Sequence, residues 1–85
     1  MENFREPQPL KLEAAAIRSL PTLSLGDSGD SVKVLQRLLL QNGYSVQVDG
    51  NFGALTETAV KAFQAAHNLA ADGVVGSRSW GELTS

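Results

Sequence analysis

One eight-residue motif occurs twice in this chain, each time at the start of a segment with helical character. Residues 49–56 (DGNFGALT) and 72–79 (DGVVGSRS) both read Asp-Gly-x-apolar-Gly-x-x-hydroxyl. In each copy the Asp side chain can accept backbone N–H bonds and the first Gly can adopt a positive φ, so each Asp-Gly predicts a tight turn. We therefore expect a chain built from repeated units, each consisting of one loop and one helix.

The other motif positions also have expected structural roles. The apolar residue is expected to anchor the loop in the core, and the second Gly to let the chain approach closely and bend into the helix. The hydroxyl lies in the first helical turn, where it can bond free N–H groups. The predicted structural loop residues are Asp49, Gly50, Gly53 and Thr56 in the first copy, and Asp72, Gly73, Gly76 and Ser79 in the second.

Apolar spacing predicts three short helices after residue 24. The first, residues 31–42, follows a turn cluster in which Asp30 or Ser31 can cap the helix. Its buried face is predicted to contain Val32, Leu35 and Leu39, and Val34 and Leu38 widen that face.

A second helix is predicted at 54–67 and a third at 77–83. Residues 45–48 are predicted to form a brief extended piece, and Asn42-Gly43 and Asn68 to end the first two helices. A second, weaker repeat reads Val-x-x-apolar-Gln and places Gln36 and Gln64 at matching positions. Each glutamine is expected to hydrogen-bond loop backbone. The second helix is expected to bury Leu55, Ala59, Ala62, Phe63 and Ala66 with Val60 beside them, and the third to bury Trp80 and Leu83.

Length and composition fit a small all-α fold. The chain has 85 residues, of which 42% are hydrophobic, and no cysteine. Helix packing must therefore stabilise it without disulfides. We predict a three-helix bundle at 23–85, preceded by an arm or linker at 1–22. Within that arm, residues 10–20 are compatible with a short docking helix or with a frayed linker.

Charge and hydropathy exclude several classes of partner. The net charge is −2 and no basic face is visible. Both features argue against nucleic acid and against an anionic membrane surface. No apolar stretch approaches the length of a transmembrane helix, which needs roughly 18 residues. The N-terminus does not resemble a secretory signal.

The residues do not predict catalysis, a metal site or a cofactor. With His67 as the single histidine and no cysteine, a metal would need several carboxylates, and these are scattered. Asp49 and Asp72 are the only carboxylates in equivalent settings. A carboxylate that accepts N–H bonds has a lowered pKa, which is the opposite of what a general acid needs. We therefore expect a chain that is not an enzyme.

Aromatic, amide and charged residues around the loops are candidates for ligand binding, because they suit sugar faces, amides and carboxylates in a preformed groove. Each has a structural alternative: core packing for Phe52 and Trp80, lid packing for Tyr44, a turn role for Asn51 and simple solvation for Arg78. The candidate set is Tyr44, Gln47, Asn51, Phe52, Arg78 and Trp80.

Three motifs in order resemble one known family. They are L-x-x-G-D-x-G-x-x-V-x-x-L-Q from Leu23, D-G-x-F-G-x-x-T-x-x-A-V-x-x-F-Q from Asp49 and D-G-x-V-G-x-x-S-W-x-x-L from Asp72. Over residues 23–83 the chain is similar to the peptidoglycan-binding domain 1 family. That resemblance implies a three-helix bundle with a repeated half, used as an accessory module on bacterial amidases, muramidases, transpeptidases and carboxypeptidases that act on cell wall.

The resemblance also implies a function. It indicates a non-catalytic, monomeric module that binds peptidoglycan or muropeptides in the cell envelope (periplasm or cell wall) and targets a tethered or separate wall-active enzyme. The alternative is a protein-interaction module, because a related fold serves as the pro-segment of matrix metalloproteinases. In that case residues 1–22 would be the natural contact with the protein partner.

Overall fold

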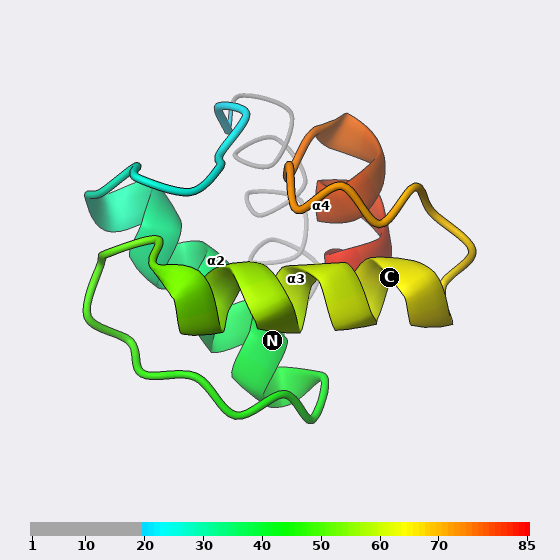
Figure 1. The fold of residues 1–85 in the computed structure, drawn as a ribbon, viewed down its shortest axis with the longest axis horizontal. Helices are drawn as coiled ribbons and strands as arrows, with labels where there is room; N and C mark the ends of the chain where they lie inside the picture. Colours follow the sequence, from blue (N-terminus) through cyan, green and yellow to red (C-terminus); the bar gives the residue numbers. More distant parts are fainter. Residues whose placement is uncertain (1–19) are drawn as a thin grey trace, which may run out of the picture.

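The computed structural model describes residues 20–85, which form three helices and no sheet. The helices are α2 (Asp30–Gln41), α3 (Ala54–Ala66) and α4 (Ser77–Thr84). Figure 1 shows α3 crossing in front of α2, with α4 above α3 in this view. The predicted all-α, three-helix class is confirmed for this part of the chain. The helix considered for residues 10–20 falls almost wholly outside the described residues.

α2 buries the face that its apolar spacing predicts. Val32, Leu35 and Leu39 have no exposed surface. Val34 and Leu38 are half-buried and pack against the same core. Burying a Val or Leu side chain completely is worth about 1.5–3 kcal/mol. This stripe is therefore a main source of stability in a domain that has no disulfide.

The C-terminal ends of α2 and α3 agree with the sequence prediction, whereas the N-terminal cap of α2 differs from it. Gly43 (φ +93°) and Asn68 (φ +60°) take the positive φ that ends α2 and α3. Both stops were predicted, since these residue types commonly follow a helix in the left-handed conformation. The predicted cap of the first helix is wrong: Asp30 is already helical, and the N-cap is Gly29, which has no side chain to offer.

The buried face of α3 differs from the predicted one. Leu55 is 74% exposed, and Ala62 and Ala66 are exposed as well, so the prediction was wrong for these three. The face is displaced because Thr56 and Gln64 are buried, each hydrogen-bonded to a buried polar partner, which a count of apolar residues misses. The buried residues of α3 are Thr56, Ala59, Val60, Phe63 and Gln64.

Residues 21–29, which we call the strap, pair with both motif loops. The strap forms one isolated antiparallel bridge to each loop, Leu23 with Val75 and Ser28 with Asn51. At its start the Pro21 carbonyl accepts a 3.1 Å bond from the indole N–H of Trp80, whose ring is buried. The predicted extended piece at residues 45–48 forms no strand, and extended pairing occurs only at these two bridges within the described residues.

None of the helices between residues 20 and 85 is long and apolar enough to cross a membrane.

Candidate functional site

A buried glutamine organises the first motif loop. Gln36 is fully buried, and its Nε2 donates to Asp49 Oδ1 (3.0 Å), to the Asn51 carbonyl (3.1 Å) and to Thr56 Oγ1 (3.1 Å). Its Oε1 accepts from the N–H groups of Asp49 (3.0 Å) and Gly50 (2.9 Å). One amide group on α2 thus fixes the backbone turn, the acidic side chain and the start of α3.

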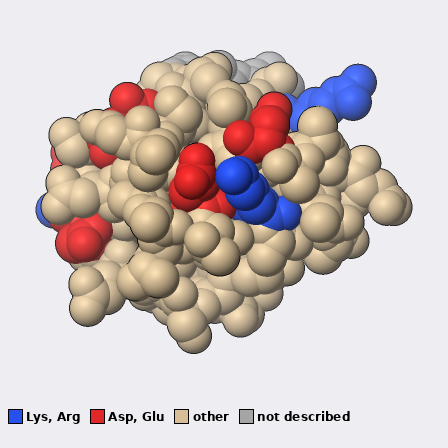
Figure 2. Space-filling model, in the orientation of Figure 1, with Lys and Arg blue, Asp and Glu red and all other residues tan. Residues whose placement is uncertain are grey.

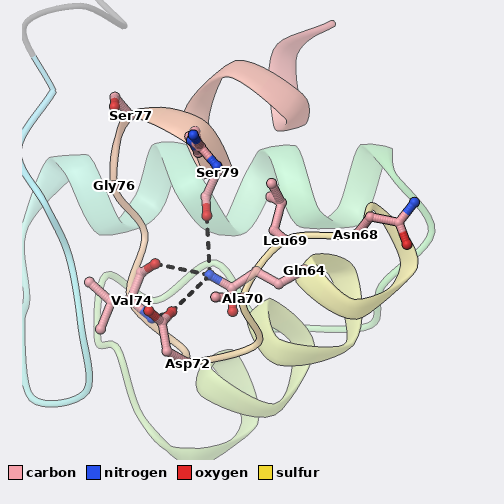
Figure 3. Close-up of a pocket in the computed structure, with 10 residues that line it drawn as sticks. Gln64, Asn68, Leu69, Ala70, Asp72, Val74, Gly76, Ser77 and Ser79 are labelled. Atoms are coloured by element: carbon pink, nitrogen blue, oxygen red, sulfur yellow. Dashed lines mark hydrogen bonds between the residues drawn. The ribbon is translucent and has the colours of Figure 1, made fainter.

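A second glutamine holds the second loop in the same way. Gln64 Nε2 donates to the Val74 carbonyl (2.9 Å), to Ser79 Oγ (3.1 Å) and to Asp72 Oδ1 (3.3 Å), as Figure 3 shows. Its Oε1 accepts from the Gly73 N–H at 2.9 Å. In both loops, therefore, a glutamine amide contacts the same motif positions.

These contacts confirm the predicted role of the glutamines and correct that of the hydroxyls. Both glutamine side chains bond loop backbone, as expected. Thr56 and Ser79 were expected to bond free N–H groups of the first helical turn. Their oxygens instead accept from the glutamine amides, which are close because both partners are buried in the same loop core.

The motif glycines fall into two kinds. Gly50 (φ +78°) and Gly73 (φ +77°) adopt a positive φ. The Asp-Gly turns predict this conformation, which glycine reaches without strain. Gly53 (φ −103°) and Gly76 (φ −101°) have extended backbone that any residue can adopt. A Cβ placed on either would meet no atom within 4 Å, so the predicted close approach at these two positions is wrong.

The acidic side chain of the first loop is held in its charged form. The Asn51 N–H donates to Asp49 Oδ1 at 2.9 Å, and the Gln36 amide donates to the same oxygen. These two hydrogen bonds, the backbone one first, hold the pKa of Asp49 below its usual value. Asp49 therefore accepts the loop N–H bonds, and has the lowered pKa, that its place in the motif predicts.

A groove opens beside the second loop, between the end of α3 and the start of α4 (Figure 3). We call it the α4 groove. It has a volume of about 410 Å³, and its lining comes from Gln64 and from residues 68–70, 72, 74 and 76–79. Sites that bind small molecules usually have volumes of about 300–1,000 Å³, so the groove is large enough for one.

The six predicted ligand contacts do not form one site. Phe52 (2% exposed) and Trp80 (1%) lie in the core, which agrees with the core-packing alternative for both residues. Tyr44 is half-buried and packs edge-on against Phe63, with ring centroids 5.9 Å apart. Arg78 is exposed and lines the α4 groove.

The remaining two, Gln47 and Asn51, are exposed in the connection between α2 and α3. They contribute nothing to the lining of the α4 groove.

Sequence reasoning missed several residues that line the groove. Asn68, Leu69, Ala70, Val74 and Ser77 were not candidates. A signal was available in the spacing, because the interacting Gln and Asp are 13 residues apart in the first unit and 8 apart in the second. In the second unit, residues directly after α3 and residues of the motif loop both line the groove.

The charged side chains of the described part are dispersed. Figure 2 shows acidic and basic groups adjacent to each other on the face drawn, without a broad basic area. Lys61 and Glu57 approach to 4.0 Å across one turn of α3, and His67 Nδ1 lies 3.3 Å from Glu82. Within residues 20–85, no three His, Asp or Glu side chains are grouped so that they could hold a metal ion.

Residues 28–83 match the family described as "Putative peptidoglycan binding domain". The zinc D-Ala-D-Ala carboxypeptidase of Streptomyces albus G is 40% identical over 65 residues, a match that covers 73% of this chain and 26% of that protein. This chain thus spans about a quarter of that relative.

Two solved structures share the fold. The endolysin of Burkholderia phage AP3 aligns with a TM-score of 0.75 at 45% identity, covering 76% of this chain and 25% of that one. The N-terminal domain of SleB aligns with a TM-score of 0.73 at 36% identity, covering 78% of this chain and 96% of that one.

The family match covers more than half of the chain and includes α2, α3, both motif loops and all of α4 except its last residue. The chain therefore belongs to the family of peptidoglycan-binding domains, a type of domain found in cell-wall enzymes.

Proposed function

We propose that this chain is a non-catalytic module of the bacterial cell envelope that binds peptidoglycan and holds a wall-active protein, tethered or separate, against the wall. The observation that carries the proposal is the α4 groove, which opens on a loop already fixed by the buried Gln64 amide. A preformed site loses little conformational entropy when it binds a ligand.

The absence of a catalytic role is supported by what the motif carboxylates do. Asp49 and Asp72 each accept a bond from the backbone N–H two residues later and another from a glutamine amide. The lowered pKa of Asp49 keeps it ionised, which does not suit a general acid. We therefore assign both residues to loop structure.

The remaining surface candidates are part of the same proposal. We assign Tyr44, Gln47 and Asn51, which lie between α2 and α3, to weaker contacts with the same polymer outside the groove. Modest affinity per module is sufficient, because tethering raises the local concentration of the attached protein near an insoluble polymer.

The two loop-and-helix units are, in this proposal, copies of one ancestral unit. The matched glutamine contacts support that origin, and the helices that precede the two loops continue for different lengths past the glutamines.

Co-sedimentation with purified sacculi tests the proposal. We expect the folded chain to pellet with sacculi in a saturable manner and not with cellulose, and to release no soluble fragments from dye-labelled wall during long incubation. Folding is checked in the same sample by circular dichroism. A folded chain that stays in the supernatant contradicts wall binding, and dye release that disappears in Asp49→Asn or Asp72→Asn contradicts the non-catalytic assignment.

A further inference from the structure

The structure points to a specific part of the wall as the ligand of the α4 groove. We infer that the groove binds a carboxylate of the stem peptide, using the Arg78 side chain, and that it does not bind the glycan strand. This inference rests on the proposed function and specifies its ligand.

The lining of the groove lacks what sugar rings need. Sugar faces commonly pack on aromatic rings, and no aromatic side chain of residues 20–85 lines the groove. The large aromatic residues Phe52 and Trp80 are buried, and Tyr44 already packs against Phe63. A glycan strand would therefore find hydroxyl and amide groups here but no platform on which to stack.

The same lining offers what a carboxylate needs. Arg78 is exposed at the groove, and no carboxylate within the described part of the chain forms an ion pair with it. A guanidinium can bind a carboxylate through two parallel hydrogen bonds. In peptidoglycan the glycan is uncharged where its lactyl groups are amide-linked to peptide, so free carboxylates belong to the stem peptides.

The groove also contains a negative charge, which further restricts the class of ligand that it can bind. Asp72 lines the groove, with its Oδ1 held by the Val74 N–H (3.0 Å) and the Gln64 amide. A polyanion would be repelled by this carboxylate, whereas a peptide can direct N–H groups or an ammonium toward it. Leu69, Ala70 and Val74 add apolar surface for short side chains. The combination suits a short peptide that carries both signs of charge.

The first unit of the same molecule provides the comparison. Position 55 in the first motif corresponds to position 78 in the second, and it holds an exposed leucine at the start of α3. The fold thus accepts a leucine at this motif position, so Arg78→Leu should remove the cation without unfolding the domain. Leu55→Arg is the matched control, since it adds a cation outside the lining of the groove.

The test is an NMR titration of the whole chain with defined wall fragments. A synthetic stem tripeptide with free carboxylates should shift the backbone amide signals of residues 68–79. The same tripeptide with its carboxylates amidated, and peptide-free glycan oligomers whose lactyl carboxylates are capped as simple amides, should leave those signals in place. We expect Arg78→Leu to weaken tripeptide binding about tenfold, the usual effect of losing one charge-assisted contact, and Leu55→Arg to leave it unchanged.

The outcomes separate the two proposals. Retention on sacculi together with glycan-induced shifts, or with equal tripeptide affinity of Arg78→Leu and the unmodified chain, overturns the carboxylate inference and leaves wall binding standing. If neither sacculi nor any fragment binds the folded chain, both proposals fail.

Discussion

The two motif loops have the same interior and different surroundings. In each loop a buried glutamine amide bonds the Asp side chain, a loop carbonyl and the helix hydroxyl. The helices behind them differ, because α2 runs five residues past Gln36 whereas α3 runs only two past Gln64. In the described part of the chain, the groove lies beside the second loop.

Comparing the two loops distinguishes the contacts that stabilise the fold from the residues that we propose recognise the ligand. The shared glutamine contacts fix the loop backbone in both units, so they do not distinguish one loop from the other. The length of the preceding helix and the residue at the second helical position, Leu55 or Arg78, differ between the units. In our proposal, both loops share the same stable scaffold, and ligand recognition depends on the residues on either side of it.

The largest expected effect comes from removing either glutamine amide while keeping its shape. Gln36→Met should destabilise the domain by about 3 kcal/mol, because several buried donors and acceptors lose their partner. Gln64→Met should cost somewhat less, since Gln36 takes part in five side-chain hydrogen bonds and Gln64 in four. Urea denaturation followed by circular dichroism measures both. Equal stability of the two variants and the unmodified chain would show that the amides do not hold the loops.

A smaller effect is expected at the glycines with positive φ, Gly50 and Gly73. Changing either to alanine should cost about 1–2 kcal/mol, because an L-residue is strained in this conformation. The added Cβ would also lie 3.2 Å from the Lys33 stem in the first case and 3.1 Å from the Lys61 stem in the second. Urea denaturation of Gly50→Ala and Gly73→Ala measures the loss.

Gly53→Ala and Gly76→Ala are the matched controls in the same denaturation series. Both positions have ordinary φ and open space. Each change should therefore stay within about 0.5 kcal/mol, because alanine is a poorer N-cap than glycine but loses less backbone entropy on folding, and these two effects oppose each other. Losses at the controls as large as those at Gly50 and Gly73 would mean that all four glycines are required for another reason.

The next prediction distinguishes the loops by function. Neither Gly53 nor Gly76 can cap its helix with a side chain. Serine at either position should therefore stabilise the domain by roughly a few tenths of a kcal/mol, because glycine is itself an acceptable N-cap residue. Only Gly76 lines the α4 groove. We expect Gly76→Ser, and not Gly53→Ser, to reduce retention on sacculi. Thermal denaturation and co-sedimentation of the same two proteins check this, and equal retention would place the ligand elsewhere.

The fold was largely predictable from the sequence because its signals are local. Helix termini at Gly43 and Asn68, and the Asp-Gly turns, follow from residue types that adopt positive φ. The buried face of α3 was not predictable from apolar residues alone, because Thr56 and Gln64 satisfy their polar groups only through tertiary contacts.

The site was harder to predict than the fold. Aromatic and amide residues near a loop look alike whether they bind ligand or fill the core, and Phe52 and Trp80 do the second. A groove depends on the distance between segments that only the folded backbone determines. Arg78 was a candidate by its chemistry, whereas Leu69 and Val74 enter the groove through the short connection after α3.

The smallest expected effect is on the stability of the domain at acidic pH. Hydrogen bonds lower the pKa of Asp49. This residue therefore contributes stability that is fully present above the usual Asp value of about 3.9 and is lost as the pH falls through its own lower pKa. Asp49→Asn has no charge to lose, so its free energy of unfolding should change less between pH 5 and pH 2 than that of the unmodified chain. Urea denaturation at a series of pH values measures the two slopes. Asp49 is exposed, so the difference between the slopes should be modest; parallel slopes would mean that the charge of this side chain, as distinct from its hydrogen-bonding shape, contributes nothing to the first loop.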